Sequence, residues 1–232
     1  MTAIIIKQKL NSLGNAQKAE KAKYFFKTGK GQYGEGDMFI GTTVPENRAV
    51  AKEHKNLSFD ELKILLNDNI HECRLCALLI LVEQFKTKDN NKRKQVYDFY
   101  LSQTHNINNW DLVDLSCYFI VGQWLLDKDR APLYQLAEST NLWEQRIAIV
   151  STIAFIRNND FEDTLKLTEK LMNHEHDLIH KACGWLLREV GKRDEAVLTN
   201  FLDTYSKQMP RTMLRYSIEK LTKEQRTHYM IK

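Results

Sequence analysis

The chain has 232 residues, of which 43% are hydrophobic and 28% are charged, and its formal net charge is +4. This composition is that of an ordinary folded protein and excludes a chain that is disordered throughout. No segment reaches the roughly 18 uninterrupted apolar residues of a membrane span, and the apolar part of MTAIIIKQKL is too short for a cleaved signal peptide. We therefore expect a cytoplasmic protein that does not enter a membrane.

Breakers of regular structure are concentrated near the amino terminus. Six of the nine glycines fall between Gly14 and Gly41, and the three prolines, Pro45, Pro132 and Pro210, each precede a stretch with helical periodicity. Proline is tolerated in the first turn of a helix. The rest of the chain carries apolar residues at three- and four-residue spacing and has no alternating strand patterns. The sequence therefore predicts an all-α protein.

The first predicted helix starts are marked by capping residues. Asn15 is a candidate N-cap before AQKAEKAKYFF, and Asp160 is a candidate N-cap before FEDTLKLTEKL. Ser58 with Glu61 forms the pattern of a capping box before LKILL. The basic run KRK within DNNKRKQ is typical of a solvated helix entry.

A glycine-rich segment, TGKGQYGEGDMFIG, follows the first of these helices. Gly29, Gly31 and Gly34 spell G-x-G-x-x-G, but a dinucleotide-binding fingerprint follows a strand and opens a helix, which is the reverse of the order here. We predict that Gly29 is the C-cap of the preceding helix and that the rest is a mobile loop. Lys27 and Lys30 are candidates for contacts with a nucleic-acid backbone.

The four cysteines are predicted to be buried, reduced thiols. Cys73, Cys76, Cys117 and Cys183 all lie in apolar segments with helical periodicity rather than in loops. Cys73 and Cys76 form a CxxC motif, but a structural zinc site needs a second pair of ligands. The sequence therefore predicts no metal site at these residues.

The predicted helices repeat along the chain. RLCALLI, DLSCYFI, RIAIVST, HKACGWL and TMLRYSI begin at Arg74, Asp114, Arg146, His180 and Thr212, in steps of 40, 32, 34 and 32 residues. Each step holds two helices and two turns, which indicates HEAT-like pairs stacked into a curved α-solenoid, a single domain over residues 1–232. The first residue of each aligned segment is polar. It serves either as a cap or solvated rim residue, or as part of the lining of the concave face.

Charge is distributed unevenly. Residues 1–57 carry a net +5, residues 58–169 carry −5, and residues 170–232 carry +4. Basic ends around an acidic centre are suited to gripping phosphates on both sides of a reaction site. Solvated surfaces with no partner explain the same pattern.

Three histidines in NHEHDLIH form the one cluster that resembles a metal site. His176 and His180 are four residues apart, but the HExxH pattern is missing and no carboxylate is evident as a third ligand. With His174 they are better explained as a polar helix start. No G-x-S-x-G motif or acyl-transfer triad is present.

The stretch NNWDLVD places an aspartate among apolar residues. On a helix that starts near Asn109, Trp110 and Asp114 lie one turn apart, and Cys117, Tyr118 and Val121 lie on the same side. A carboxylate there needs a charged or hydrogen-bonding partner. One explanation is a salt bridge to Arg146 in the next repeat. The other is stabilisation of a transient cation, as glycosidic-bond cleavage requires.

NNWDLVD, LWEQRIAIVST, KACGWLLREVGKRD and MPRTMLRYSIEKL together resemble the AlkD-type DNA alkylation repair family of HEAT-like-repeat glycosylases. The resemblance covers nearly the whole chain. It implies hydrolysis of the N-glycosidic bond of N3- and N7-alkylated purines in double-stranded DNA by a monofunctional enzyme without a cofactor or metal. It further implies a monomer that is associated with the nucleoid when bound to DNA.

The resemblance also implies the site residues. Trp110, Asp114, Arg146 and Trp185 are the residues that match the family's concave site. Asp114 would stabilise the positive charge that develops on the sugar and would position water. Trp110 and Trp185 would present ring faces to the cationic nucleotide. Arg146 would hold a backbone phosphate.

The remaining site assignments are less central. Tyr24 is the best match to a tyrosine of the amino-terminal helix, and Phe25 and Phe26 are neighbouring candidates. Five further basic residues either contact DNA phosphates or are merely solvated: Lys181, Arg188, Lys192, Arg211 and Arg215. Arg188 and Arg215 are the preferred candidates for phosphate contacts. Trp143 is expected in the core. The alternatives are a non-catalytic helical-repeat scaffold that binds DNA or protein, and a metal-dependent hydrolase that uses the His174 cluster.

Overall fold

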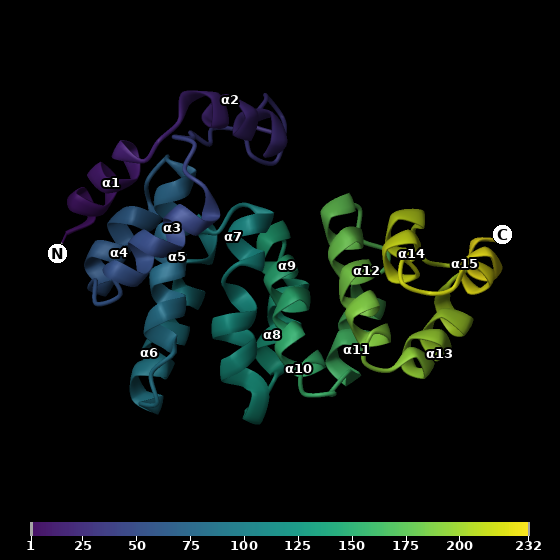
Figure 1. The fold of residues 1–232 in the computed structure, drawn as a ribbon. Helices are drawn as coiled ribbons and strands as arrows, with labels where there is room; N and C mark the ends of the chain where they lie inside the picture. Colours follow the sequence, from purple (N-terminus) through teal and green to yellow (C-terminus); the bar gives the residue numbers. More distant parts are fainter. Residues whose placement is uncertain (1, 232) are drawn as a thin grey trace. The chain divides into compact units, whose positions relative to one another are not determined.

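The computed structural model describes residues 2–231, and these residues form helices joined by turns and by one longer irregular segment between Phe25 and Val44 (Figure 1). No strand occurs among them, apart from one isolated bridge between Met38 and Ile70. None of the described helices is long and apolar enough to cross a membrane. The described chain divides into two compact units, one ending at Ile120 and the other beginning at Val121. The prediction of an all-α protein is confirmed.

The first unit is built around one buried helix, α5 (His71–Phe85). Around it lie α1 (Ala3–Ser12), α2 (Ala16–Phe25), α3 (Val44–Glu53), α4 (Phe59–Leu66), α6 (Asn90–Ser102) and the short α7 (Trp110–Asp114), with a 3-10 turn at Thr104–Asn106. Helices α3, α4, α6 and α7 all pack against α5. Because α5 is enclosed by so many neighbours, every one of its residues from His71 to Val82 is buried. The charged residues among them therefore need buried partners.

The second unit is built in the same way around α12 (Asp177–Gly191). Its other helices are α8 (Ala131–Glu138), α9 (Leu142–Ser151), α10 (Ile153–Ile156), α11 (Glu162–Leu171), α13 (Glu195–Tyr205), α14 (Arg211–Ser217) and α15 (Lys223–Met230), with a 3-10 turn at Leu125–Asp127. Helices α9, α11, α13 and α14 pack against α12. Trp143, on α9, is buried as predicted.

Four of the five aligned segments lie along one helix each, whereas DLSCYFI contains only the last residue of α7. The five segments begin within α5, α7, α9, α12 and α14, and in each unit these helices pack against their sequence neighbours. The prediction of HEAT-like helical pairs is confirmed at this level. The polar residues at the first aligned position are not solvated rim residues in two of the repeats, because Arg74 and Arg146 are buried.

The helix starts confirm some of the predicted caps. The Asn15 side chain accepts a hydrogen bond from Lys18 N at 3.0 Å, and Pro45 and Pro132 lie in the first turns of α3 and α8. The Asp160 prediction is wrong. Helix α11 begins at Glu162 after the N-cap Phe161, and the Asp160 carboxylate instead forms an ion pair with Arg130 at 2.7 Å.

Only half of the predicted capping box at Ser58 is present. Ser58 Oγ accepts a hydrogen bond from Glu61 N at 3.4 Å. The Glu61 carboxylate does not return to the backbone of Ser58 but accepts a hydrogen bond from Ala3 N at 2.6 Å. It thereby binds the start of α1 to the start of α4, a long-range contact that the local pattern did not contain.

The glycine-rich segment differs from its prediction. Gly29 is not the C-cap of α2, because the helix ends at Phe25 and the chain turns at Lys27, whose φ is 55°. The second half of the segment is hydrogen-bonded to the rest of the first unit. Met38 N donates to Asn69 O at 3.0 Å and Gly41 N donates to the Glu72 carboxylate at 2.7 Å. These bonds hold the segment against the start of α5.

All four cysteines are buried and free, as predicted. Burial raises the pKa of the Cys73, Cys76 and Cys183 thiols to about 12. These thiols are therefore protonated at neutral pH and behave as small apolar core residues.

Gly184 allows α12 and α14 to pack closely. A Cβ atom at this position would lie 2.4 Å from Met213 O and 2.6 Å from Tyr216 Cβ. We expect Gly184→Ala to lower the free energy of unfolding by about 1–3 kcal/mol, because the two helices must move apart. Urea denaturation measures the change. Gly191→Ala is the matched control, since its added Cβ meets only the side chain of Leu198. An equal loss in both variants would contradict the explanation.

Candidate functional site

The short helix α7 carries two of the predicted site residues at its two ends. Asn109 caps it by accepting a hydrogen bond from Trp110 N at 2.8 Å, so the helix begins at Trp110 and ends at Asp114. Both of these side chains are half-buried. The prediction that they lie one turn apart on one short helix is therefore confirmed.

The sequence predicted a helix that continues regularly beyond Asp114, and this prediction is wrong. The helix breaks at Leu115, where Ser116 Oγ donates to Leu112 O at 2.5 Å, and a π-helical turn follows at Tyr118–Gly122. Ser116 competes with the regular backbone pattern by bonding one turn back. Cys117 is fully buried, whereas Asp114 is half-buried.

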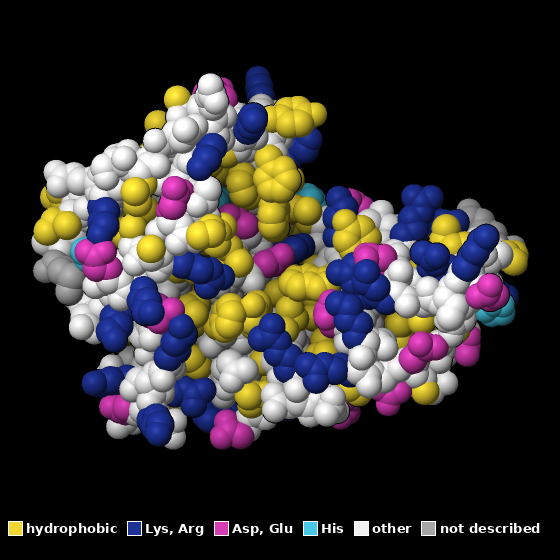
Figure 2. Space-filling view, in the orientation of Figure 1, with side chains coloured by type: hydrophobic (Ala, Val, Ile, Leu, Met, Phe, Trp, Pro, Cys, Tyr) yellow, Lys and Arg dark blue, Asp and Glu magenta, His cyan; other side chains and the backbone are white. Residues whose placement is uncertain are grey.

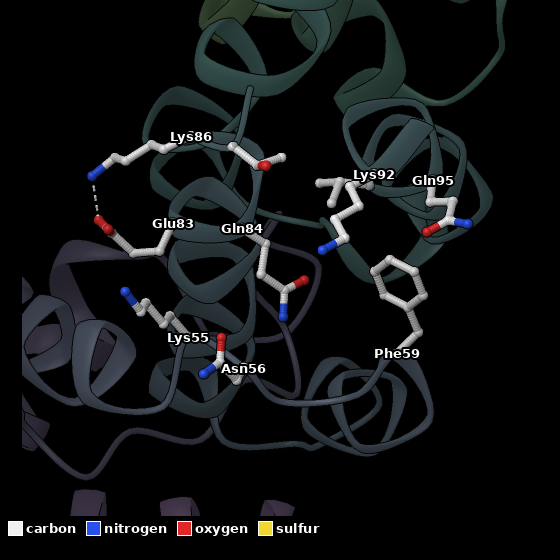
Figure 3. A pocket seen from close by; sticks show the side chains of 10 residues that line it. Lys55, Asn56, Phe59, Glu83, Gln84, Lys86, Lys92 and Gln95 are labelled. Carbon is white, nitrogen blue, oxygen red and sulfur yellow. Dashed lines mark hydrogen bonds and ion pairs between the residues drawn. The ribbon is translucent and has the colours of Figure 1, made fainter. Parts of the chain in front are cut away.

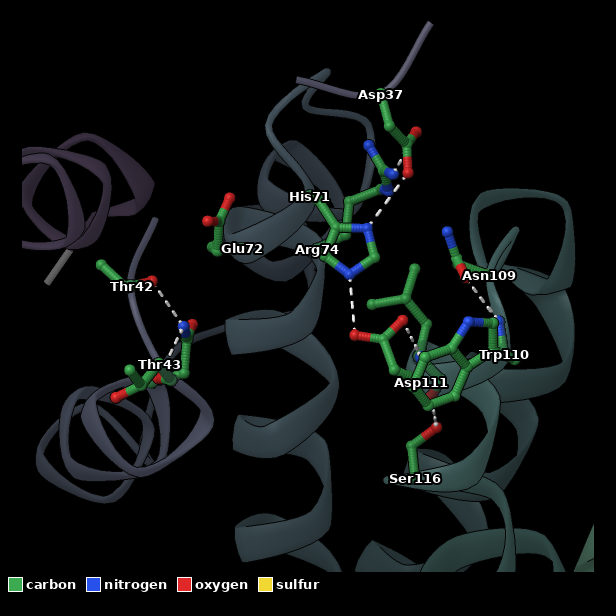
Figure 4. Close-up of polar contacts among 12 residues, drawn as sticks. Asp37, Thr42, Thr43, His71, Glu72, Arg74, Asn109, Trp110, Asp111 and Ser116 are labelled. Atoms are coloured by element: carbon green, nitrogen blue, oxygen red, sulfur yellow. Dashed lines mark hydrogen bonds and ion pairs between the residues drawn. The ribbon is translucent and has the colours of Figure 1, made fainter. Parts of the chain in front are cut away.

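The two aspartates of NNWDLVD have different surroundings. Asp111 is 6% exposed, and one of its oxygens accepts a hydrogen bond from His71 Nε2 at 2.8 Å (Figure 4). Its other oxygen accepts one from Leu112 N at 2.8 Å. Asp114 is half-buried and ends the helix. Asp111 is therefore an internal structural carboxylate, and Asp114 is the carboxylate of the pair that a ligand reaches more readily.

A buried charge network joins α7 to α5 and to the glycine-rich segment (Figure 4). His71 is 2% exposed and lies between Asp111 and Asp37, whose carboxylate is 3.1 Å from Nδ1. Arg74 donates to the other oxygen of Asp37 at 2.6 Å and to Asp68 O at 2.8 Å. Two cations thus face two carboxylates inside the first unit, and each charge has a partner.

The neighbouring charges determine the protonation states of His71 and Asp37. Burial alone would lower the pKa of His71, but the charge and hydrogen bond of Asp111, together with Asp37, raise that pKa to about 9. Burial alone would raise the pKa of Asp37, but its hydrogen bond from His71 and the charge of Arg74 hold that pKa below the usual value. His71 is therefore a doubly donating imidazolium at neutral pH.

Aromatic rings pack over this network and hold Trp110. The Phe26 ring stacks on Trp110 with centroids 5.4 Å apart and on Phe39 at 5.1 Å. His71 lies 4.7 Å from Phe39 and 4.9 Å from Phe26. The orientation of Trp110 is therefore set by α2 and by the glycine-rich segment as well as by its own helix.

Sequence patterns alone did not identify His71, Asp37 and Glu72 as part of this site. A signal for them was present in IHECRLCALLI, where three charged or titratable residues open a helix that is otherwise apolar. Such residues cannot be buried without partners. The partner Asp37 lies in an irregular segment more than thirty residues earlier, which helical periodicity does not connect to α5.

The amino-terminal candidates are not equivalent. Tyr24 is 81% exposed, and Lys27 Nζ lies 4.8 Å from its ring centroid. Phe25 and Phe26, rather than Tyr24, contact Trp110, with centroids 5.6 Å and 5.4 Å away. Lys27 and Lys30 are exposed. The structure thus brings the Phe25–Phe26 pair to Trp110 and leaves Tyr24 beside it on the surface.

The second unit contains the other predicted residues. Arg146 is 5% exposed and donates from Nη1 to Leu178 O at 2.6 Å, and Trp185 is half-buried on α12. Arg188 forms an ion pair with Glu219, whereas Arg215 is exposed on α14. Arg146 is thus largely buried, unlike a surface arginine that contacts a phosphate. Its contact with DNA stays a prediction.

Three other surface cations of this unit have protein partners. Lys181 forms an ion pair with Asp177 at 2.8 Å, and Lys192 forms one with Glu189 at 2.7 Å. Arg211 donates to Met230 O at 3.3 Å.

The histidine cluster is a polar helix start, as the sequence favoured. His176 is the N-cap of α12 and accepts a hydrogen bond from Leu178 N at 3.1 Å. His174 Nε2 is 2.8 Å from Gln145 Oε1, and the His180 ring bonds to His174 O. Within residues 2–231, no group of three or more His, Cys, Asp or Glu side chains is placed to hold a metal ion.

A separate cleft of about 620 Å³ lies in the first unit, far along α5 from its buried charges (Figure 3). Lys55, Phe59 and Lys92 are among its lining residues, and Lys86 pairs there with Glu83. None of the predicted site residues lines it. Lys92 belongs to the KRK run and is exposed at the start of α6, where Asp89 is the N-cap.

These features define an all-helical protein of HEAT-like helical pairs, with a tryptophan and an aspartate at the two ends of one short helix. The chain belongs to the DNA alkylation repair enzyme family, whose model matches residues 6–221. No curated protein sequence matches it.

Two solved structures share the fold. A predicted DNA alkylation repair enzyme from Enterococcus faecalis has a TM-score of 0.68 and 18% identity, over 90% of this chain and 97% of that one. The second is described as belonging to a new family related to the HEAT-like repeat DNA glycosylases with affinity for branched DNA structures. It has a TM-score of 0.59 and 12% identity, over 94% and 83% of the two chains. At these identities the likeness establishes the fold.

Proposed function

We propose that the protein is a DNA glycosylase that hydrolyses the N-glycosidic bond of N3- and N7-alkylated purines in double-stranded DNA. Membership of the DNA alkylation repair family supports a role in DNA repair. The observation that carries the proposal is the pair at the ends of α7. Asp114 is the half-buried carboxylate one turn from Trp110, and Trp110 is held in place by a packed aromatic stack.

The chemistry follows from the charge of the substrate. An alkylated purine already carries positive charge, so its departure with the electron pair of the C1′–N bond leaves a neutral base. No general acid is needed. Positive charge then develops on the deoxyribose, where the Asp114 carboxylate stabilises it and accepts the proton of the water that attacks C1′. A preorganised charge of this kind contributes about 3 kcal/mol.

The aromatic side chains bind the cationic nucleotide in this proposal. The Trp110 ring presents a face to it, and a partly desolvated cation–π contact contributes about 2 kcal/mol. Trp185 serves the same purpose from the second unit. Arg146, Arg188 and Arg215 bind backbone phosphates of the same DNA, as do Lys27 and Lys30. The protein acts as a monomer in the cytoplasm, near the nucleoid.

Release of free base tests the proposal. The protein is incubated with duplex DNA that contains 7-methylguanine, and the supernatant is analysed chromatographically for free base. We expect release of 7-methylguanine, no release of guanine from the unmodified duplex, and no effect of a chelator. Absence of release from the methylated duplex would reject the proposed function, and inhibition by the chelator would favour a metal-dependent hydrolase.

A second candidate function is binding without catalysis. The description of one structural relative attributes to that family an affinity for branched DNA structures, and helical-repeat proteins commonly serve as binding surfaces. A scaffold of this kind binds branched DNA more tightly than linear duplex and releases no base. The same release assay therefore separates the two candidates.

A further inference from the structure

The end of α2 presents an aromatic surface to solvent. Tyr24 and Phe25 are adjacent in the chain, and both are exposed well beyond what is usual for large rings. They line an open hollow of about 750 Å³ together with Phe26, Lys18, Glu20, Lys21 and Ala22. Figure 2 shows hydrophobic side chains gathered among lysine and arginine side chains in this part of the first unit. An exposed apolar surface with a polar rim indicates a binding site.

The geometry of the rings singles out Phe25. Phe26 stacks between Phe39 and Trp110, with interplanar angles of 11° and 24°, so both of its faces are used. Phe25 meets Phe26 and Trp110 edge to face, with interplanar angles of 86° and 73°. Phe25 therefore lies outside the parallel stack of Phe39, Phe26 and Trp110. Because its side chain is 60% exposed, much of its ring is open to a flat ligand.

The rim of this surface is basic. Between Ala16 and Gly36 the chain has five lysines and two glutamates, a net charge of +3. Lys23 pairs with Glu20 at 2.5 Å, and the charge of Lys18 acts on Glu46, whereas Lys21 is exposed on the same helix. A ligand that fits this surface has a flat aromatic group and carries a negatively charged group next to it.

We propose that Phe25 and Tyr24 form a stacking platform for an unpaired base of DNA, next to Trp110, while Lys18 and Lys21 neutralise the neighbouring phosphates. An unpaired base offers a free aromatic face beside a phosphate, whereas the faces of paired bases are covered in the duplex. The inference rests on the proposed function in that the bound polymer is DNA. It adds a second contact, separate from Asp114, that recognises the loss of base pairing.

Binding of unmodified DNA tests the platform without any base release. Two duplexes of equal length are compared by fluorescence anisotropy, one fully paired and one with a single bulged 2-aminopurine. We expect the wild-type protein to bind the bulged duplex more tightly and to quench its 2-aminopurine. Phe25→Ala should weaken binding to the bulged duplex about tenfold, the effect of losing one base stack, and change binding to the paired duplex less than about twofold.

Matched variants separate stacking from other causes. Phe25→Leu keeps an apolar side chain of similar size without an aromatic face and should behave like Phe25→Ala, whereas Phe25→Trp should retain the preference. Ile64→Ala removes another exposed apolar side chain, on α4, and should have no effect. Wild-type affinity in Phe25→Leu, or equal wild-type affinity for both duplexes, would overturn the inference. Because the DNA is unmodified, either result leaves the base-release assay to decide the proposed function separately.

Discussion

Asp114→Asn is expected to lower the rate of 7-methylguanine release by about 10²–10³-fold, which corresponds to roughly 3–4 kcal/mol of transition-state stabilisation. The asparagine has nearly the same shape but no negative charge, so the cation that develops on the deoxyribose loses its fixed counter-charge. Single-turnover kinetics with excess enzyme measures the chemical step directly. The affinity for the methylated duplex should change much less than the rate.

Asp111→Asn is the matched control on the same short helix. Asp111 is bonded internally to His71, and its replacement leaves a buried imidazolium with one carboxylate fewer. We expect this variant to lose about 3–5 kcal/mol of folding stability, because it breaks a buried ion pair. If the rate of base release in Asp114→Asn stays within a few-fold of wild type, the role assigned to Asp114 is wrong.

Much of the fold was predictable because it depends on local patterns. Apolar spacing and the scarcity of breakers beyond Gly41 indicated helices, and four of the five aligned segments lie along one helix each, the exception being the segment that opens at Asp114. The errors occurred where a side chain found a distant partner in place of a local one. Glu61 binds Ala3 N and Asp160 binds Arg130, and neither contact is visible from the neighbouring sequence.

The candidate site shows the same limit more sharply. The sequence placed Trp110 and Asp114 one turn apart, but both aspartates of NNWDLVD fit a carboxylate at the start of an apolar stretch. Only the position of His71 distinguishes the internal one from the more accessible one. The contact of Phe25 and Phe26 with Trp110 depends on how the glycine-rich segment folds back onto α5, which periodicity cannot express.

The stability of the protein should fall as the pH rises from 6.5 to above 9, because of His71. Its pKa is about 9 in the folded protein, whereas the ordinary pKa of a solvated histidine, as in the unfolded chain, is 6.5. The folded state therefore binds a proton that the unfolded state has already lost in this range. The contribution is complete below pH 6.5 and is lost as the pH rises through 9. The shift corresponds to about 3 kcal/mol.

His71→Gln isolates this contribution, because glutamine keeps a hydrogen-bond donor but does not titrate. Urea denaturation of both proteins from pH 6 to pH 10 gives the difference in the free energy of unfolding, in which the other titrating groups largely cancel. We expect that difference to shrink by about 3 kcal/mol across the range. A difference that does not vary with pH would mean that His71 is neutral in the folded protein. The carboxylates of Asp37 and Asp111 would then lack the cation that binds the glycine-rich segment to the helix of Trp110 and Asp114.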